Sequence, residues 1–403
     1  MSKTNKKKIL YIHHGSGIGG APLSLLFLIR KLDRSKYDPI VLCLHESEAA
    51  DLYRKEGIET FVERGITDFS HTEQDWYKLS NPFPFLYRLF NFIPSIYKTY
   101  KFVKKISPDI VHLNSSTLSP SAIGSKLAGS KVVWHIREPL SNGYFGLRRY
   151  AIRKIIHKYS DKIIAICKND ADKLMPSDKI KVVYNFVDFK EFDRNISGTN
   201  FRREFDLDEN TKAVGMLGGV LRIKGTFEFL KSLKKVKENI KNVKYFVIGS
   251  YPSEVKGIKK ITSTDNYNYF KEIKSFLRRE GLEEDVIFTG VRLDIPEVIA
   301  GLDLIVFPSI VPHFARPIIE AGAMAKPVVA SNLEGPQELI EDGETGILVD
   351  INDPDNLARA IIEILSNEET AKKMGEAGYK RAREMFNADI NVKEIIEVYE
   401  EFA

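Results

Sequence analysis

Residues 303–331, DLIVFPSIVPHFARPIIEAGAMAKPVVAS, hold the most informative pattern in the sequence: two short apolar runs with a helical stretch between them. The runs DLIVFPS and KPVVAS are nearly continuous in apolar residues, which is typical of buried parallel strands. Between them, Pro317 suits the first turn of a helix that starts at RPIIEAGAMA. The pattern predicts a strand, a helix and a second strand of one parallel sheet.

The same alternation of short strands and longer helices extends over the whole chain. It restarts near residue 212, after a polar connector at residues 188–210. We therefore expect an α/β protein with two doubly wound domains, residues 1–197 and 198–385. The expected strands are KILYIH, DPIVLCL, IETFV, DIVHL, KVVWHI, DKIIAIC and KIKVVYN in the first domain, and KAVGML, VKYFVIG, DVIFTG, DLIVFPS, KPVVAS and TGILV in the second.

The composition excludes several classes of protein. Of 403 residues, 43% are hydrophobic, which is too many for a disordered chain, and no run of apolar residues is long enough to span a membrane. The basic start MSKTNKKK is followed by ILYIHHG rather than by the apolar region of a signal peptide, so we expect a cytoplasmic protein. Cys43 and Cys167 lie in apolar runs and are expected in the core.

The formal net charge of +5 is divided unevenly along the chain. Residues 1–197 carry +12 and residues 198–403 carry −7. A basic half indicates an anionic partner, such as a phosphorylated or membrane-bound substrate. Nucleic acid is not expected as a partner, because the positive residues are scattered and no recognition motif appears.

A glycine-containing loop follows the first strand of the first domain. Gly15, Gly17 and Gly20 formally satisfy G-x-G-x-x-G, a pattern of dinucleotide-binding proteins. The best acidic candidate after the second strand, Glu46, lies further along the chain than that pattern requires. We therefore favour a looser interpretation, in which the loop approaches some phosphate or sugar.

A second glycine loop follows the first strand of the second domain. Gly218-Gly219 ends the strand, and Lys224-Gly225 starts a helix. A Lys at a helix start after a glycine turn is well placed to hold a pyrophosphate, and Arg222 is a candidate second cation. The alternative is a solvated basic turn.

Glu320 is the acidic residue of the helix in residues 303–331. An acid in the first turn complements the helix dipole, which is one explanation of its presence. Small residues follow it at 321–323 and allow close approach of another group. A carboxylate facing a cleft there would accept hydrogen bonds from a ribose diol.

With these loops in place, the chain resembles the large fourth family of glycosyltransferases, which has the GT-B architecture of two Rossmann-like domains facing a cleft. The resemblance covers nearly the whole chain, and the order and spacing of its motifs are specific. These are GIGGA, PDIVHLNS, VVWHIREP, DKIIAICKNDADKL, VVYNFVD, the KG turn, VIFTG, DIPEVIAGLDLIVFPS, RPIIEAGAMAKPVVAS and GPQELIEDGETGILVD. In this fold the last helix, here within residues 386–403, crosses back to the first domain.

The resemblance implies retaining transfer of a sugar from a nucleoside diphosphate sugar, a UDP-sugar or a GDP-sugar, to an acceptor, without a cofactor or bound metal. The acceptor would bind mainly to the N-terminal domain and the donor to the C-terminal one. By the match, Lys224 would hold the donor diphosphate, Glu320 the ribose and His135 the transferred sugar. Gly19 and Gly20 would lie against the diphosphate or the donor sugar.

Two positions depart from the family pattern. Pro312 stands where the family usually has the first of two Glu residues, and Gly219 stands where it commonly has Arg. Arg222 is a candidate to compensate for the missing Arg. The candidates to replace the missing Glu are His313 and the backbone N–H groups of Phe314 and Ala315.

The chemistry to be supported is the departure of a nucleoside diphosphate. Negative charge builds on the β-phosphate, and Lys224, the glycine-loop amides and the helix start near Arg316 would stabilise it. Asp206-Leu207-Asp208 formally matches D-x-D, a metal-binding pattern of a different transferase fold, but we expect Asp208 to cap or solvate a turn.

Three alternatives stay open at this stage. One is an oxidoreductase that uses Gly15, Gly17 and Gly20 for a dinucleotide. Another is a nucleotide-sugar 2-epimerase, which shares the architecture. The third is a catalytically silent homologue that serves as a binding subunit, suggested by Pro312 and Gly219.

The stretch of residues 82–109 combines aromatic and basic side chains. Leu86, Leu89, Phe90 and Ile93 lie at helical spacing, and Pro94 is expected to break or kink the helix. An ordinary helix packed on the sheet explains most of these residues. The lysines that follow and the surplus aromatics also fit peripheral contact with an anionic membrane and a lipid-linked or polysaccharide acceptor.

Overall fold

The computed structural model describes residues 6–15, 17–69, 83–252 and 264–402. The chain divides into two compact units, with boundaries between Phe186 and Val187 and between Asn387 and Ala388. The last segment therefore belongs to the first unit, although it follows the second in sequence.

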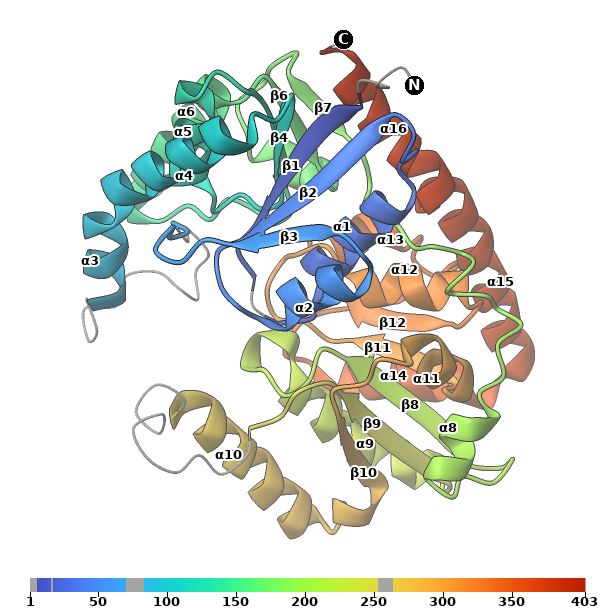
Figure 1. Ribbon diagram of the computed structural model, residues 1–403. Coiled ribbons are helices and arrows are strands. Elements are labelled where there is room, and N and C mark those ends of the chain that lie inside the picture. The colour runs from blue at the N-terminus through green and yellow to red at the C-terminus, as the bar shows by residue number, and fades with distance from the viewer. Residues whose placement is uncertain (1–5, 16, 70–82, 253–263, 403) are drawn as a thin grey trace. The chain divides into compact units, whose positions relative to one another are not determined.

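The first unit is built on a parallel sheet with the order β3-β2-β1-β4-β5-β6-β7 (Figure 1). Its strands are β1 (Lys7–His13), β2 (Tyr37–Cys43), β3 (Glu59–Val62), β4 (Ile110–Leu113), β5 (Lys131–Ile136), β6 (Lys162–Ala165) and β7 (Ile180–Val182). Its helices are α1 (Gly20–Arg30), α2 (Glu48–Lys55), α3 (Phe83–Phe90), α4 (Phe92–Ile106), α5 (Ser119–Leu127), α6 (Leu147–Tyr159), α7 (Lys168–Asp172) and α16 (Ala388–Glu400).

The second unit repeats this plan with the order β10-β9-β8-β11-β12-β13. Its strands are β8 (Lys212–Leu217), β9 (Val243–Ile248), β10 (Val286–Gly290), β11 (Leu304–Phe307), β12 (Val328–Ser331) and β13 (Ile347–Val349). Its helices are α8 (Thr199–Glu204), α9 (Thr226–Asn239), α10 (Thr264–Glu280), α11 (Ile295–Gly301), α12 (Arg316–Ala323), α13 (Pro336–Leu339), α14 (Pro354–Ser366) and α15 (Glu368–Met385).

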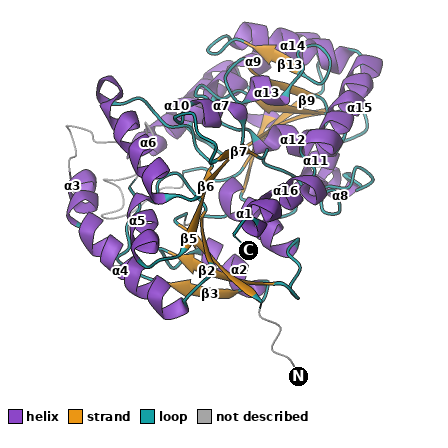
Figure 2. Cartoon of the chain, turned by 90° about the horizontal axis from the view of Figure 1, so that it is seen from above, coloured by secondary structure: helices purple, strands orange, loops and turns teal. Residues whose placement is uncertain are grey.

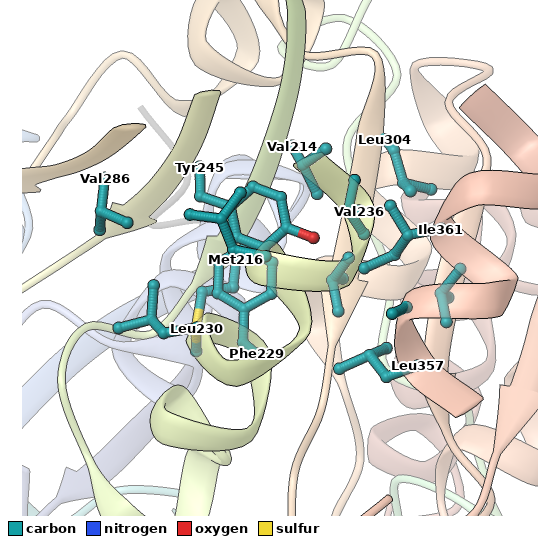
Figure 3. Packing of buried hydrophobic residues seen from close by; sticks show 14 of the residues in the cluster. Val214, Met216, Phe229, Leu230, Val236, Tyr245, Val286, Leu304, Leu357 and Ile361 are labelled. Atoms are coloured by element: carbon teal, nitrogen blue, oxygen red, sulfur yellow. The ribbon is translucent and has the colours of Figure 1, made fainter. Parts of the chain in front are cut away.

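Every strand expected from the sequence is present, and all the paired strands of both sheets are parallel. Helices cover the sheets, so apolar side chains on both strand faces are buried, as the continuous apolar runs predict. Figure 3 shows part of the second core, where Met216 and Tyr245 of the sheet meet Phe229 and Leu230 of α9, and Leu357 and Ile361 of α14 lie nearby. The Phe229 and Tyr245 rings stack with their centroids 4.4 Å apart.

Both cysteines are buried in the first core, as expected. Burial raises the pKa of the Cys43 thiol to about 12, because a thiolate would lose its hydration there. The thiol therefore stays protonated at neutral pH and behaves as a small apolar side chain.

The boundary after the first sheet lies earlier than the expected 197/198, because the start of the polar connector packs on the second unit. The Val187 amide donates to the Phe386 carbonyl at 2.9 Å, and the Phe189 ring meets the Tyr379 ring edge to face. Arg194 pairs with Glu376 of α15. These contacts assign the connector to the second unit.

Helix α16 packs within the first unit through both its ends. Lys31 Nζ lies 2.8 Å from Asp389 Oδ1 at its start, and Tyr399 is fully buried near its end. The return of the last helix to the first unit, implied by the resemblance, is therefore present.

The expected break at Pro94 is wrong in position. Helix α3 ends at Phe90 and α4 begins at Phe92, so Pro94 lies in the first turn of α4, where a missing N–H costs nothing. Helix α4 buries Ser95, Thr99, Phe102 and Val103 rather than Ile93, which stays exposed. None of the helices among the described residues combines the length and apolarity needed to cross a membrane.

Candidate functional site

The main site of the second unit lies where the strand order reverses, between β8 and β11. The loops at the carboxyl ends of these two neighbouring strands meet there, and ligands of open α/β sheets bind at such points. One loop runs from Gly218 to Gly225, and the other runs from Pro308 to Ala315.

Backbone contacts lock the two loops together. Gly225 has a positive φ of 68°, and a Cβ at this position would collide with the Pro308 carbonyl oxygen. The Ile310 amide donates to the Ile223 carbonyl at 3.0 Å, and Ser309 Oγ donates to the same oxygen at 3.0 Å. Only glycine allows this approach, which fixes Lys224 beside the second loop.

Lys224 and His313, one from each loop, form a direct hydrogen bond. Lys224 Nζ donates to His313 Nε2 at 2.6 Å. His313 Nδ1–H donates to the Val311 carbonyl at 3.0 Å, which fixes the tautomer and leaves Nε2 as an acceptor. The Phe307 ring lies against both, 5.5 Å from Nζ and 5.2 Å from the imidazole centre.

Burial sets the charge of this pair. Loss of hydration lowers the pKa of Lys224 to about 8. Burial, and then the nearby Lys224 charge, lower the pKa of His313 to about 3. A mostly charged lysine therefore meets a neutral imidazole at pH 7. Among the described residues no carboxylate forms an ion pair with Lys224, so the pair carries a net positive charge suited to an anion.

Glu320 does not cap α12, because the helix begins at Arg316 and has no acid in its first turn. It is buried and pairs with Arg316 one turn earlier, with Nε and Nη2 lying 2.9 and 2.8 Å from the same oxygen, Oε1. The small residues beside it receive α15, since a Cβ at Gly322 would lie 3.1 Å from the Gly378 carbonyl. Phe314 and Ala315 are buried and lead directly into the helix.

The structure explains one of the two departures from the family pattern. Gly219 has a φ of 71°, and a Cβ there would collide with the Ser250 carbonyl oxygen, so this backbone cannot carry an Arg. Arg222 does not take that place beside Lys224. It is exposed, and it contacts α10 instead, 4.4 Å from the Tyr269 ring centre and 3.6 Å from Glu272.

The first unit gathers buried polar side chains at its own reversal of strand order, between β1 and β4. His135 at the end of β5 is buried, with Nδ1 3.1 Å from His112 Nε2. His112 Nδ1 in turn lies 2.8 Å from the Tyr399 hydroxyl of α16. Burial and the Arg137 charge lower the pKa of both histidines well below the usual range, so both are neutral.

The two ring nitrogens of His135 differ in their hydrogen bonding. Its Nε2 is buried and has no hydrogen-bond partner among the described residues, while Nδ1 faces His112 and, at 3.5 Å, Arg137 Nη2. Arg137 Nε donates to Asn114 Oδ1 at 2.6 Å, and Asn114 Nδ2 lies 3.2 Å from His13 Nδ1. His112, Arg137 and Tyr399 were not predicted, although the first two lie in quoted motifs, because nothing in the sequence shows that they converge.

Gly19 and Gly20 lie at the exposed start of α1, with Gly19 as its N-cap. A Cβ at Gly19 would meet no atom, so its conformation is not forced by packing. Ser16 of the same loop lies outside the described residues. Asp208 accepts a hydrogen bond from Thr211 Oγ1 at 2.7 Å and closes a turn, as expected. The part of the chain that is described holds no cluster of three or more His, Cys, Asp or Glu side chains able to bind a metal.

Comparison with known proteins assigns both units. The model described as Glycosyltransferase Family 4 matches residues 18–191, and that described as Glycosyl transferases group 1 matches residues 198–381. The chain belongs to the family 4, group 1 glycosyltransferases, and its two parallel-sheet units are those of the GT-B fold. These matches give no support to the oxidoreductase alternative.

Sequence identity to individual relatives is low. The chain is 25% identical over 246 residues to N-acetyl-alpha-D-glucosaminyl L-malate synthase of Bacillus anthracis, which covers 60% of this chain and 58% of the relative. It is 24% identical over 282 residues, 66% of this chain, to UDP-Gal:alpha-D-GlcNAc-diphosphoundecaprenol alpha-1,3-galactosyltransferase of Escherichia coli, 68% of which is covered. Relatives from Methanocaldococcus jannaschii and Staphylococcus aureus are covered over 54% and 66% of their length.

The fold extends over the whole of a solved relative. Anabaena Alr3699/HepE, crystallised in complex with UDP, is 22% identical with a TM-score of 0.79, covering 98% of this chain and all of that one.

The contact between the two loops makes a testable prediction about stability. Gly225→Ala should destabilise the protein more than Gly281→Ala, which has a similar φ of 65° but no atom near its Cβ. Each substitution should cost about 1 kcal/mol for the left-handed backbone, and only Gly225→Ala adds the collision with Pro308. Urea unfolding of both variants measures the difference, and equal losses would contradict a locked contact.

Proposed function

We propose that this protein transfers a sugar from a nucleoside diphosphate sugar, a UDP-sugar or a GDP-sugar, to a glycan or lipid-linked acceptor, with retention of configuration and without a bound metal. The observation that carries the proposal is the hydrogen-bonded Lys224–His313 pair at the reversal of strand order. Family membership and the UDP and UDP-glucose complexes of Anabaena HepE support the donor class.

Lys224 is the residue proposed to hold the donor diphosphate. As the bond to the sugar breaks, charge builds on the β-phosphate, and a preorganised cation stabilises that charge without reorganisation. His313 is a neutral acceptor that orients Nζ but does not cancel its charge. The backbone N–H groups of Phe314 and Ala315 and the start of α12 at Arg316 are proposed to assist, because helix N-termini attract anions.

Glu320 is proposed to bind the nucleotide ribose. Both contacts with Arg316 use Oε1, which leaves Oε2 to accept hydrogen bonds from the ribose hydroxyls. The two contacts with Arg316 also hold the buried carboxylate in one orientation.

In the first unit, His135 is proposed to contact the transferred sugar. Its unpartnered Nε2 is the atom suited to a sugar hydroxyl, and the His112–Tyr399 chain holds the ring in place. Gly19 and Gly20 at the start of α1 are proposed to approach the diphosphate or the donor sugar through their backbone.

Two other functions are compared with this proposal. Pro312 and Gly219 at the usual Glu and Arg positions favour a catalytically silent homologue that binds a nucleotide sugar as a subunit. A nucleotide-sugar 2-epimerase shares the architecture and would use the same Lys224 site.

Turnover of the donor distinguishes these functions. The purified protein should slowly hydrolyse one member of a panel of UDP- and GDP-sugars to the nucleoside diphosphate and free sugar, with or without EDTA. Lys224→Ala should lower this rate about 10²–10³-fold, as loss of one transition-state donor does. The control Lys231→Ala, on the partly exposed surface of α9, should leave the rate unchanged.

Chromatography of the products decides between the outcomes. Tight binding without turnover, even with cell-extract acceptors, would favour the silent homologue. An epimerised sugar would favour the epimerase, and a rate abolished by EDTA would contradict metal independence.

Binding of a nucleoside diphosphate should be linked to proton uptake. The pKa of Lys224 is about 8 in the free protein, and a bound diphosphate favours the charged amine and raises that pKa. Affinity should therefore be full below pH 8 and fall by up to about tenfold per pH unit above it. Calorimetry of UDP and GDP at pH 8, in two buffers of different ionisation enthalpy, should show uptake of about half a proton.

The matched variants for this experiment are Lys224→Met and Lys231→Met. Proton uptake should vanish in the first and persist in the second. Uptake that survives Lys224→Met would assign the proton to another group.

The acceptor is proposed to be met at an anionic membrane surface. On α3 and α4, Phe83, Phe90, Ile93 and Tyr97 are between 55% and 76% exposed. Lys101, Lys104 and Lys105 lie exposed on the same stretch of chain. Exposed aromatics beside lysines are suited to the interface of an anionic bilayer. The name of the Escherichia coli relative includes a diphosphoundecaprenol-linked sugar, which supports a lipid-linked acceptor.

Co-sedimentation with phosphatidylglycerol-containing liposomes tests the membrane contact. Replacing Lys101, Lys104 and Lys105 by Glu should weaken binding by at least about 3 kcal/mol at low salt, since each lysine near the surface contributes about 1 kcal/mol. The control replaces the exposed Lys372, Lys373 and Lys380 of α15 by Glu, with the same change in net charge. Wild-type protein that remains in the supernatant at low salt would contradict the contact.

A further inference from the structure

An apolar groove of about 470 Å³ lies in the first unit, lined by residues of α3, α4 and α6. Its walls include Phe85, Leu89, Phe92, Leu147 and Ile155, and its exposed surface is apolar. Phe69 lies at its base, with ring centres 6.2 Å from Phe85 and 5.6 Å from Phe92. A groove of this kind accepts a hydrocarbon chain, because it offers apolar contact without polar groups to desolvate.

A second cavity, of about 580 Å³ and with charged side chains in its lining, shares α3 with the groove. It is lined by residues that follow β2 and β3, including Glu46, Arg64 and Asp68, and by Tyr87 and Arg88 of α3. It therefore lies at the carboxyl ends of two strands, the edge where α/β sheets bind ligands. The two acids are paired, Glu46 with Arg54 and Asp68 with Arg88 Nε at 3.5 Å. Arg64 and Arg88 beside the exposed Tyr87 ring are therefore the groups suited to a sugar phosphate.

Helix α3 separates the two spaces. Phe85 and Leu89 line the groove, whereas Tyr87 and Arg88, on the intervening positions, line the cavity. Neighbouring residues before α3 are divided in the same manner, since Asp68 lines the cavity and Phe69 lines the groove. This loop is anchored to α4, since Ser95 Oγ accepts from the Thr67 amide at 2.9 Å. The groove and the cavity therefore share α3 and residues 68–69 as a common wall, so a molecule that crosses this wall would contact both.

The helices around the groove and the cavity carry a positive formal charge. Helices α3, α4, α5 and α6 lie side by side on one flank of the first sheet, with α5 packed between α4 and α6 (Figures 1 and 2). Together they contain eleven Lys and Arg residues and no Asp or Glu. Such a layer attracts anions and disfavours cationic partners.

We propose that the groove and the cavity form one binding site for an anionic amphiphile, with its hydrocarbon chain in the groove and its phosphate and attached sugar in the cavity. The proposal rests on the proposed glycosyltransferase function for its biological meaning, since the amphiphile would be the lipid-linked acceptor. It differs from membrane contact, because one chain is held by one protein without a bilayer.

Dodecyl phosphate, used as a monomer below its critical micelle concentration, tests the site by calorimetry without any transfer reaction. It should bind with a stoichiometry of one, at least tenfold more tightly than inorganic phosphate or dodecyl maltoside. Ala151→Trp, which fills the groove from an exposed position of α6, should weaken binding at least tenfold. Leu147→Ser, which needs no extra space, should also weaken it.

The matched control is Leu127→Trp, at an exposed apolar position of α5 that does not line the groove, and it should bind normally. Arg64→Gln should reduce the preference for dodecyl phosphate over dodecyl maltoside. Equal binding by wild type, Ala151→Trp and Leu147→Ser would overturn the proposal, as would binding seen only with vesicles. Hydrolysis of the nucleotide sugar is measured separately, so failure of this site and failure of the proposed function are distinguishable.

Discussion

The parallel direction of the strands is the constraint on which the rest of this structure depends. Each strand must be followed by a crossover before the next parallel strand, so all the loops after the strands meet at one edge of each sheet. Ligands of open α/β sheets bind outside the carboxyl ends of the strands, at the point where the strand order reverses. In the second unit that position brings Lys224 and His313 to 2.6 Å, and in the first it brings His13, His112 and His135 into one buried network.

Burial gives both groups of residues their chemical character. Burial removes water from the Lys224 amine and lowers its pKa to about 8. The neutral His313 imidazole accepts a hydrogen bond from the amine, and under the proposed function a bound phosphate favours its charged form. The same backbone geometry that fixes the site also accounts for a departure from the family pattern. Gly219 adopts a conformation and a contact with Ser250 that exclude an Arg side chain. Under the proposed function, the second unit therefore relies on the Lys224–His313 pair and not on a second cation at position 219.

The positive charge of the first unit lies on one group of helices. Its helices α3 to α6 carry only positive formal charges, and several of their apolar side chains, among them Phe90, Ile93 and Leu147, are exposed beside them. The charge of +12 in residues 1–197 is therefore concentrated in these four helices, which lie on one flank of the sheet (Figure 2 shows their positions). That combination favours an anionic amphiphile over a polar anion alone.

The two parallel sheets could be predicted from the sequence, because a strand buried on both faces must be almost wholly apolar and is recognisable as a local apolar run. The sequence also identified Lys224 and His313 as separate candidates, since glycine turns and helix starts are local patterns. Three contacts could not be predicted and become evident from the packing of the chain. Lys224 donates to His313, Glu320 pairs with Arg316 instead of capping α12, and Tyr399 of the last helix contacts His112. The packing also shows that Leu89 and Ile93 face outward, whereas Ser95 and Thr99 are buried. Contacts between residues distant in sequence, and the choice of which helix face is covered, depend on how elements pack, and no local pattern encodes that.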